Sequence, residues 1–228
     1  LSNTKAQSAN FPFCTIEPNL GKINVPDERL NYLEKIVDPK KVSPTSIEIL
    51  DIAGLVKGAN KGEGLGNKFL GNIRETDAII HVIRCFDDNE IVHVDGSINP
   101  IRDKETIELE LQLKDLESVE KKLSKIERAS SSGDKDAQNE HAVLNKIIDN
   151  LKSSRNVRSI KFTEEDRLKF IKPLQLLTDK PILYVCNVSE NDVVSGNKYV
   201  EMIQKAALLE QAQVIFLGVK IEADINEL

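Results

Sequence analysis

An aspartate and a glycine three residues apart, Asp51 and Gly54, stand where a short β-branched run ends and a glycine-rich stretch begins. Six of the chain's eleven glycines lie between Gly54 and Gly71. Glycine lets a backbone adopt positive φ or approach another group closely, and that group is commonly a phosphate. In a nucleotide hydrolase, the aspartate of a D-x-x-G motif holds the water shell of a metal ion and the glycine N–H faces the γ-phosphate. An aspartate-capped flexible turn gives the same pattern, so the motif alone does not distinguish a nucleotide site from an ordinary turn.

Three further residues fit the same chemistry. Thr15 lies in a predicted loop upstream, where a hydroxyl can close on Mg²⁺ when a γ-phosphate is present. Asn187 ends an apolar run and Glu190 follows it; an amide offers both donor and acceptor to a purine edge, and a carboxylate accepts from N–H groups. Each residue by itself is also an ordinary turn residue. The order threonine, D-x-x-G, N-x-x-E is nevertheless the order used by P-loop GTPases.

The elements that must position these residues alternate between strands and helices. The predicted strands are 21–25, 45–50, 77–86, 180–187 and 212–217, and the predicted helices between them include 67–76, 197–210 and one that begins at Pro26 and ends before Pro39. The last three strands are apolar almost throughout, as in a sheet covered on both faces. This pattern predicts an α/β domain with a mainly parallel sheet and a ligand at the carboxyl ends of its strands.

The middle of the chain follows a different pattern. Between Lys104 and Ala129, apolar residues recur at steps of three and four, and they are Leu109, Leu113, Leu116, Val119, Leu123 and Ile126. After a Ser/Gly break, a second segment carries Leu144, Ile147, Ile148 and Leu151. Two amphipathic helices predict an antiparallel hairpin that projects from the sheet domain, or alternatively a pair lying flat on it. We therefore expect a nucleotide-binding domain of residues 1–103 and 155–228, interrupted by a hairpin of residues 104–154.

Composition limits the class of protein. The chain has 228 residues, of which 30% are charged and 40% hydrophobic, as in globular proteins. The net charge of −6 gives no overall attraction to nucleic acid, and we expect no sequence-specific DNA partner. Contact with RNA or a ribosome would rely on local runs such as Lys121–Lys125 and Arg155–Arg158, and the pattern favours ordinary solvated faces for both. No apolar run approaches the roughly 20 residues that cross a bilayer, so we expect a cytoplasmic protein without a membrane partner. Cys14, Cys85 and Cys186 are scattered, which favours reduced thiols over disulfides or zinc.

Four segments carry a resemblance to a known family. They are PFCTIEPN, DIAGLVKGANKGEGLGNKFLGNIRETDAI, RCFDDNEIVHVDGSINPIRD and NVSE. The chain resembles, over practically its whole length, the Obg-related YchF family of Obg-like ATPases. The resemblance implies a Ras-like P-loop NTPase fold, an OBG-type G domain, interrupted by a helical hairpin. It also implies Mg²⁺-dependent hydrolysis of ATP, with GTP less favoured, and association with the ribosome.

The resemblance assigns roles to the metal and phosphate residues. Thr15 matches the first-switch threonine, and Asp51 and Gly54 match the second-switch pair. Leu55 stands where Ras-like enzymes place the glutamine that orients the attacking water, and leucine cannot hydrogen-bond that water. The resemblance offers His93, the histidine proposed in this family to approach the γ-phosphate. The other two histidines, at positions 81 and 141, keep structural interpretations.

The base-reading residues depart from the usual GTPase pattern. Asn187 and Glu190 match the motif N-K-x-D, but Val188 replaces the lysine and Glu190 replaces the aspartate that pairs with guanine. The longer carboxylate should misplace that contact, so we expect relaxed guanine specificity with ATP accepted. Gly218 and Val219 loosely match the fifth motif, whose backbone amides touch the base.

One expected motif does not occur. The family's phosphate loop, G-x-x-x-x-G-K-[ST], is absent from these residues, and the resemblance places it shortly before Leu1. The family's TGS domain would follow Leu228. We therefore expect a chain truncated at both ends, whose 228 residues bind nucleotide weakly. Two alternatives remain open: a guanine-specific, translation-associated GTPase, and a non-hydrolysing interaction module that uses the helical hairpin.

Overall fold

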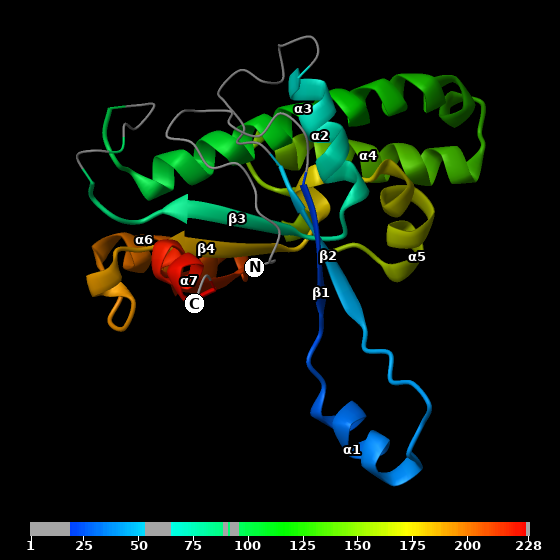
Figure 1. The fold of residues 1–228 in the computed structure, drawn as a ribbon. Coiled ribbons are helices and arrows are strands. Elements are labelled where there is room, and N and C mark those ends of the chain that lie inside the picture. Colours follow the sequence, from blue (N-terminus) through cyan, green and yellow to red (C-terminus); the bar gives the residue numbers. More distant parts are fainter. Residues whose placement is uncertain (1–18, 53–64, 89–90, 92–95, 227–228) are drawn as a thin grey trace. The chain divides into compact units, whose positions relative to one another are not determined.

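The computed structural model describes residues 19–52, 65–88, 91 and 96–226 (Figure 1). The chain divides into two compact units, Leu1–Gly54 and Leu55–Leu228, each of which is described by itself. Three of the predicted site residues, Thr15, Gly54 and His93, lie outside the described residues.

The first unit is a strand pair with a helix in its connection. Strand β1 (Asn19–Asn24) pairs antiparallel with β2 (Ser46–Asp51), and Asn19 lies opposite Asp51 in the register. Helix α1 (Glu28–Val37) connects them, and its N-terminus is capped by Asp27, whose carboxylate accepts from the Arg29 N–H at 3.0 Å. These elements confirm the predicted strands at 21–25 and 45–50. Asp51 ends β2, so the D-x-x-G motif does follow a strand.

The second unit contains a parallel sheet. Strands β3 (Ile79–Arg84), β4 (Ile182–Asn187) and β5 (Gln213–Leu217) lie in the order β3-β4-β5 and all run the same way, which confirms the expected parallel sheet. Asn187 pairs with Arg84 on one side and with Leu217 on the other. The three carboxyl ends therefore lie at one edge of the sheet, and Figure 1 shows those of β3 and β4.

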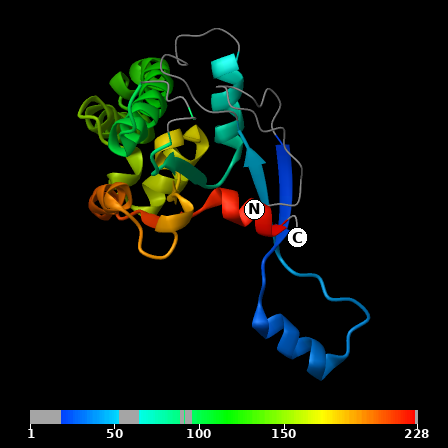
Figure 2. The same cartoon turned by 60° about the vertical axis from the view of Figure 1, so that its left-hand side comes forward.

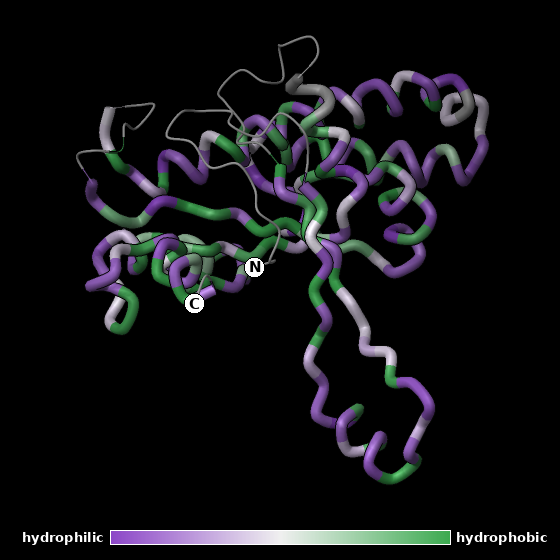
Figure 3. The backbone as a smooth tube through the Cα atoms, viewed as in Figure 1, coloured by the Kyte–Doolittle hydropathy of each residue, from purple (hydrophilic) through white to green (hydrophobic). Residues whose placement is uncertain are grey.

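Helices cover one face of this sheet. Helix α6 (Lys198–Glu210) lies between β4 and β5 in the chain and packs on the sheet through a shared apolar core, formed by Ile83, Cys85, Tyr184, Cys186, Val188, Val200, Ile203 and Ala207. Cys85 and Cys186 in this core are buried free thiols. Helix α2 (Leu65–Glu75) precedes β3, and α7 (Val219–Asn226) follows β5. Figure 3 shows that the residues of β3 are largely hydrophobic, whereas hydrophobic and hydrophilic residues alternate along the helices.

The predicted helical hairpin is present. Helix α3 (Pro100–Ser131) and helix α4 (Lys135–Lys152) run side by side (Figure 2), joined by a turn in which Gly133 has a φ of +93°. The Asp134 carboxylate caps α4 by accepting from the N–H groups of Asp136 at 2.9 Å and Ala137 at 3.1 Å. The pair shares its core with the segment 157–176, through Val157, Ile160, Phe170, Ile171 and Leu176. The base of the hairpin is thus packed against the chain that follows it.

The buried face of α3 differs from the predicted apolar stripe. Leu109 and Leu113 are 49% and 38% exposed, whereas Glu108, Gln112 and Asp115 are buried. These three polar residues lie on the same side of the helix as Val119, which belongs to the hairpin core. The face that α3 turns toward the protein is therefore polar near its base and apolar beyond it. The prediction was wrong here because the buried polar groups find partners elsewhere in the chain.

A polar cluster joins the base of α3 to the sheet. Glu108 accepts from Lys104 at 2.8 Å, from Arg158 at 2.6 Å and from the Tyr184 hydroxyl at 2.9 Å. The same Tyr184 hydroxyl lies 2.8 Å from the Glu210 carboxylate at the end of α6, so the two carboxylates share its one proton as acceptors. Burial by itself would raise the pKa of Glu108, but Lys104 and Arg158 outweigh it and hold that pKa below its usual value. Glu108 therefore favours its ionised form, and the cluster ties α3, β4 and α6 together.

His81 on β3 makes stability depend on acidity. Burial lowers the pKa of its imidazole to about 4; among the charges facing it, Lys104 and Arg158 lower it further, while Glu108 and Asp103 oppose that effect. In the unfolded chain the His81 imidazole becomes protonated near pH 6.5, whereas in the folded chain it stays neutral until about pH 4. The stability that this residue contributes is therefore complete above pH 6.5 and is lost as pH falls toward 4. We expect a loss of up to about 3 kcal/mol in the free energy of unfolding over this interval. Urea denaturation at pH 7.5, 6 and 4.5 should show a shallower decline for His81→Gln, and equal declines would contradict this.

Candidate functional site

Asn187 is fixed at the carboxyl end of β4. Its side-chain Oδ1 accepts from the Val219 N–H at 3.1 Å, at the start of α7. Its main-chain carbonyl accepts from the Cys85 N–H at 2.8 Å, and the Val188 N–H donates to the Leu217 carbonyl at 3.1 Å. The Asn187 Nδ2 has no partner among the described residues. The Asn187 side chain is therefore held through its Oδ1, and its Nδ2 remains available to donate to a ligand.

Glu190 and Asp192 differ in what they contact. Glu190 is exposed, and within the described part of the chain its carboxylate has no hydrogen bond or ion pair. Asp192 accepts from Asn197 Nδ2 and from the Ser189 hydroxyl, both at 2.8 Å, and these bonds lower its pKa. Asp192 thus closes the turn after β4, whereas Glu190 is the carboxylate that remains free for a ligand.

Gly218 and Val219 follow β5 at the same edge of the sheet. A Cβ atom at Gly218 would lie 2.9 Å from Val193 Cγ2, a distance that real Cβ contacts essentially never show. Glycine therefore lets the start of α7 approach the turn that follows Asn187. The structure thus brings Asn187, Val188, Glu190, Gly218 and Val219 to one edge, with Val188 itself buried in the sheet core.

Asp51 is the one predicted metal ligand that the structure describes. It is exposed at the end of β2, in the first unit, and its carboxylate has no described partner. A single carboxylate that holds Mg²⁺ together with waters and phosphate oxygens is the usual arrangement for this ion, so the residue fits the metal. No group of three or more histidine, cysteine or acidic side chains gathers as a metal site within the residues that the structure describes.

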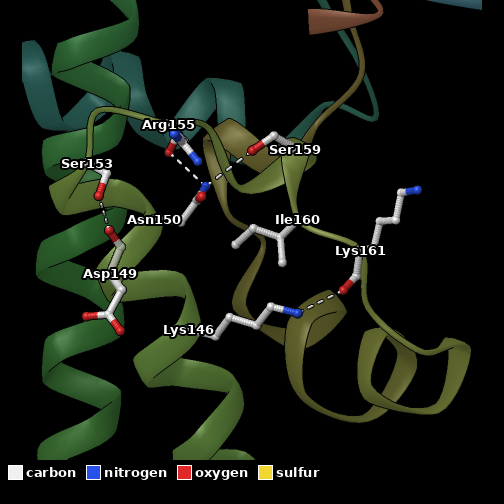
Figure 4. Close-up of a pocket in the computed structure, with 8 residues that line it drawn as sticks. All are labelled: Lys146, Asp149, Asn150, Ser153, Arg155, Ser159, Ile160 and Lys161. Carbon is white, nitrogen blue, oxygen red and sulfur yellow. Dashed lines mark hydrogen bonds between the residues drawn. The ribbon is translucent and has the colours of Figure 1, made fainter.

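A separate polar hollow of about 420 Å³ lies at the end of α4 (Figure 4). Its floor is held by Asn150, which donates to the carbonyls of Arg155 at 3.2 Å and Asn156 at 2.9 Å. Lys146 points to the Lys161 carbonyl, and the Lys161 side chain extends away from the hollow. None of its lining residues comes from a strand end, and its polar groups largely satisfy one another. We assign it to the structure of the hairpin base.

Three residues at this edge were missed by the sequence interpretation. Asn197 caps α6 through the N–H groups of Tyr199 and Val200 and also donates to the Cys85 carbonyl at 2.7 Å. The second missed residue is Asp192, which accepts from Asn197, so the two residues join the ends of β3 and β4. The third is Arg84, which donates to the main-chain carbonyls of Phe86, Asp88 and Ile91. An asparagine just before an amphipathic segment is a helix-cap signal, but nothing local indicates its contact with Cys85.

The helices in the described ranges are all too short or too polar to cross a bilayer.

Comparison with known proteins gives consistent matches. Residues 1–127 match the family described as "50S ribosome-binding GTPase". Across its full length the chain is 52% identical to the ribosome-binding ATPase YchF of Bacillus subtilis and 46% identical to that of Escherichia coli O157:H7, covering 63% and 62% of those proteins. It therefore spans less than two thirds of the curated relatives it matches.

A solved structure agrees with these sequence matches. The structure of the Schizosaccharomyces pombe YchF GTPase superposes with a TM-score of 0.78 and 38% identity, covering 96% of this chain and 60% of that one. The chain thus has a P-loop GTPase fold that contains this parallel sheet. The chain belongs to the 50S ribosome-binding GTPase family and is homologous throughout its length to the YchF proteins.

Proposed function

We propose that the protein hydrolyses ATP in a Mg²⁺-dependent reaction, with GTP less favoured, as a ribosome-associated switch in the cytoplasm. The observation that supports this most is the state of Asn187, whose Oδ1 accepts from the Val219 N–H while its Nδ2 has no partner among the described residues. The relatives' printed description as ribosome-binding ATPases supports the activity and the partner.

The geometry at Asn187 favours a purine without demanding guanine. The free Nδ2 is a donor, and N7 is an acceptor common to adenine and guanine. Guanine specificity requires a carboxylate placed to accept from two adjacent N–H donors, and the longer Glu190 does not reproduce the position of an aspartate. Adenine does not present two adjacent N–H donors, and its exocyclic amine can donate to a carboxylate. Relaxed specificity, with ATP accepted, follows from these two side chains.

The phosphate end of the site would be built from the switch residues. Bound Mg²⁺ would neutralise charge on the phosphate oxygens during transfer. Asp51 would hold the water shell of this ion, and Thr15 would supply a hydroxyl ligand. The Gly54 N–H would donate to the γ-phosphate. His93 would orient the attacking water, because Leu55 offers no hydrogen-bonding group.

The α- and β-phosphates need further donors. A G-x-x-x-x-G-K-[ST] loop supplies most of the amides around them, and these 228 residues contain none. We therefore expect the chain alone to bind a fluorescent ATP analogue with Mg²⁺ only weakly, and a protein that includes such a loop to bind it tightly. Micromolar affinity of the 228-residue chain would contradict this expectation.

Competition between nucleotides tests the proposed function. In a preparation that includes the phosphate loop, unlabelled ATP should displace a fluorescent analogue at a lower concentration than GTP and should be turned over. A strong preference for GTP would contradict the account of Glu190 and indicate a guanine-specific GTPase. Binding without turnover would instead indicate an interaction module.

Gly218 should matter because the turn after β4 has no room for a side chain. Gly218→Ala would bring a Cβ to 2.9 Å from Val193, whose β-branched side chain is stiff, so the turn that carries Glu190 must shift. We expect nucleotide affinity to fall by about tenfold, as when a well-placed contact is lost. The matched control is Gly71→Ala in α2, where a Cβ would meet nothing within 4 Å. Equal titration curves for the two variants would contradict the prediction.

A further inference from the structure

The turn between β4 and α6 is closed by one carboxylate, that of Asp192. Its Oδ2 accepts from the Ser189 hydroxyl and from Asn197 Nδ2, both at 2.8 Å. The Asp192 N–H donates to the Ser189 carbonyl at 3.0 Å, and the Asp192 carbonyl accepts from the Gly196 N–H at 2.8 Å. Glu190 lies between Ser189 and Asp192 in the sequence. The backbone that carries the Glu190 side chain is therefore held on both sides.

Asn197 ties this turn to two other elements. Its Nδ2 makes a second donation, to the Cys85 carbonyl after β3 at 2.7 Å. Its Oδ1 accepts from the N–H groups of Tyr199 at 3.0 Å and Val200 at 3.2 Å, at the start of α6. Both amide protons and both lone pairs of this side chain are thus used. An amide that is satisfied in this way has a fixed orientation, so it fixes Asp192 relative to the end of β3 and the start of α6.

The other side of the turn packs against the end of β5. Val193 belongs to the turn, and a Cβ atom at Gly218 would lie only 2.9 Å from Val193 Cγ2. Asn187, whose Oδ1 accepts from the Val219 N–H at 3.1 Å, ends β4 three residues before Glu190. The two side chains that are proposed to meet the base thus come from one strand end and the closed turn that follows it.

The Glu190 side chain is not held by any contact of its own. Its carboxylate is exposed and, over the described ranges, makes no hydrogen bond or ion pair. A glutamate side chain has many rotamers, so the reach of the carboxylate depends on where the turn places its backbone. An ionised carboxylate only accepts hydrogen bonds, and the exocyclic amine of adenine is a donor. A displaced turn would therefore move this acceptor away from the amine.

We propose that Asp192 and Asn197 are positioning residues that hold the Glu190 carboxylate where it accepts from the exocyclic amine of adenine, and so set the preference for ATP over GTP. The inference rests on the proposed function, in which Glu190 faces the base. Asp192 and Asn197 act on the nucleotide only through the turn. Loosening the turn should therefore weaken the binding of a base that carries this amine and spare a base that lacks it.

Nucleotide titration of Asp192 variants tests this inference, in a protein that joins a phosphate loop to this chain and with each nucleotide in its non-hydrolysable β,γ-imido form. Asp192→Ala should lower the ratio of ATP affinity to GTP affinity by about tenfold, as when a hydrogen bond to a charged group is lost. Affinity for purine riboside triphosphate, which keeps N7 but lacks the exocyclic amine, should stay within about twofold. Asp192→Asn retains an oxygen for both donors and should keep most of the preference for ATP.

The chain offers a matched control for the loss of this carboxylate. Asp166, in helix α5 (Glu164–Asp166), accepts from the Thr163 hydroxyl at 2.7 Å across the same spacing of three residues. Asp166→Ala should leave the ratio of ATP affinity to GTP affinity unchanged. Asn197→Ser tests the second positioning residue, because serine keeps an oxygen to cap α6 but removes both amide donors. It should lower the ratio as Asp192→Ala does.

A Glu190 variant separates this inference from the proposed function. In a Glu190→Ala background, Asp192→Ala should cause no further change in the ratio, because the carboxylate that it positions is gone. If Glu190→Ala lowered the ratio but Asp192→Ala and Asn197→Ser did not, the inference would be overturned and the proposed function would stand. An equal loss of affinity for all three nucleotides in these two variants would also overturn it. If Glu190→Ala left the ratio unchanged, the role proposed for Glu190 would fail, and the inference with it.

Discussion

Asp115→Ala is expected to lower the free energy of unfolding by about 3–5 kcal/mol, the largest single-residue stability effect that we predict. Asp115 is fully buried on α3. Its carboxylate accepts from the N–H groups of Leu177 at 2.9 Å and Thr178 at 2.7 Å, and from the Thr178 hydroxyl at 2.8 Å. Alanine would leave three buried donors without an acceptor, and each carries a desolvation cost.

The same contact anchors the hairpin to the sheet domain. Thr178 lies in the short helix η5 (Leu177–Asp179), just before β4. Urea denaturation of Asp115→Ala should be compared with Glu105→Ala, an exposed acidic position on the same helix that should change stability by less than about 0.5 kcal/mol. Equal stabilities of the two variants would show that the buried carboxylate is not the anchor.

His93→Ala should lower kcat for ATP by at least about 100-fold, the second large effect, because a positioned acid or base contributes about 10²–10⁴ in rate. Nucleotide affinity should stay within about threefold, since the proposed imidazole contact is made to the attacking water and not to the base. The measurement is single-turnover hydrolysis beside analogue titration, in a preparation in which a phosphate loop precedes this chain.

His141 provides the matched control for this prediction. It lies on α4 of the hairpin, where its ring contacts Asn145 at 3.0 Å. His141→Ala should leave kcat unchanged. A loss of nucleotide affinity in His93→Ala equal to its loss of kcat would assign His93 to ground-state binding and contradict the catalytic role.

The sequence was informative where structure depends on near neighbours. Apolar runs predicted β3, β4 and β5, and the caps at Asp27 and Asn197 are typical helix-start residues followed by apolar spacing. Each of these signals lies within a few residues of the element that it predicts. The parallel pairing then follows from the alternation of strands and helices.

The polar face of α3 could not be predicted in this way. Glu108 and Asp115 are charged, and isolated charges on a helix are usually solvated. They are buried because Arg158 and Thr178, 50 and 63 residues further along the chain, satisfy them. No local window contains both partners, so the apolar spacing of Leu109 and Leu113 appeared to define the buried side.

The same difference between local signals and distant contacts applies to the candidate site. Residue types at strand ends were enough to select Asn187, Glu190 and Gly218, which the structure places at one edge, and their role in binding remains a prediction. The supporting contacts were not visible in the sequence. Arg84 is simply a charged residue at the end of an apolar strand until its three carbonyl acceptors are seen.

The central claim is that a purine nucleotide binds at the carboxyl ends of β3, β4 and β5, and a structure of a protein that joins this chain to a phosphate loop, with Mg²⁺ and a non-hydrolysable ATP analogue, tests it most directly. The account predicts that a purine ring nitrogen accepts from Asn187 Nδ2 and that Asp51 lies in the water shell of the metal. A base bound away from Asn187, or a nucleotide without Asp51 near its metal, would contradict it.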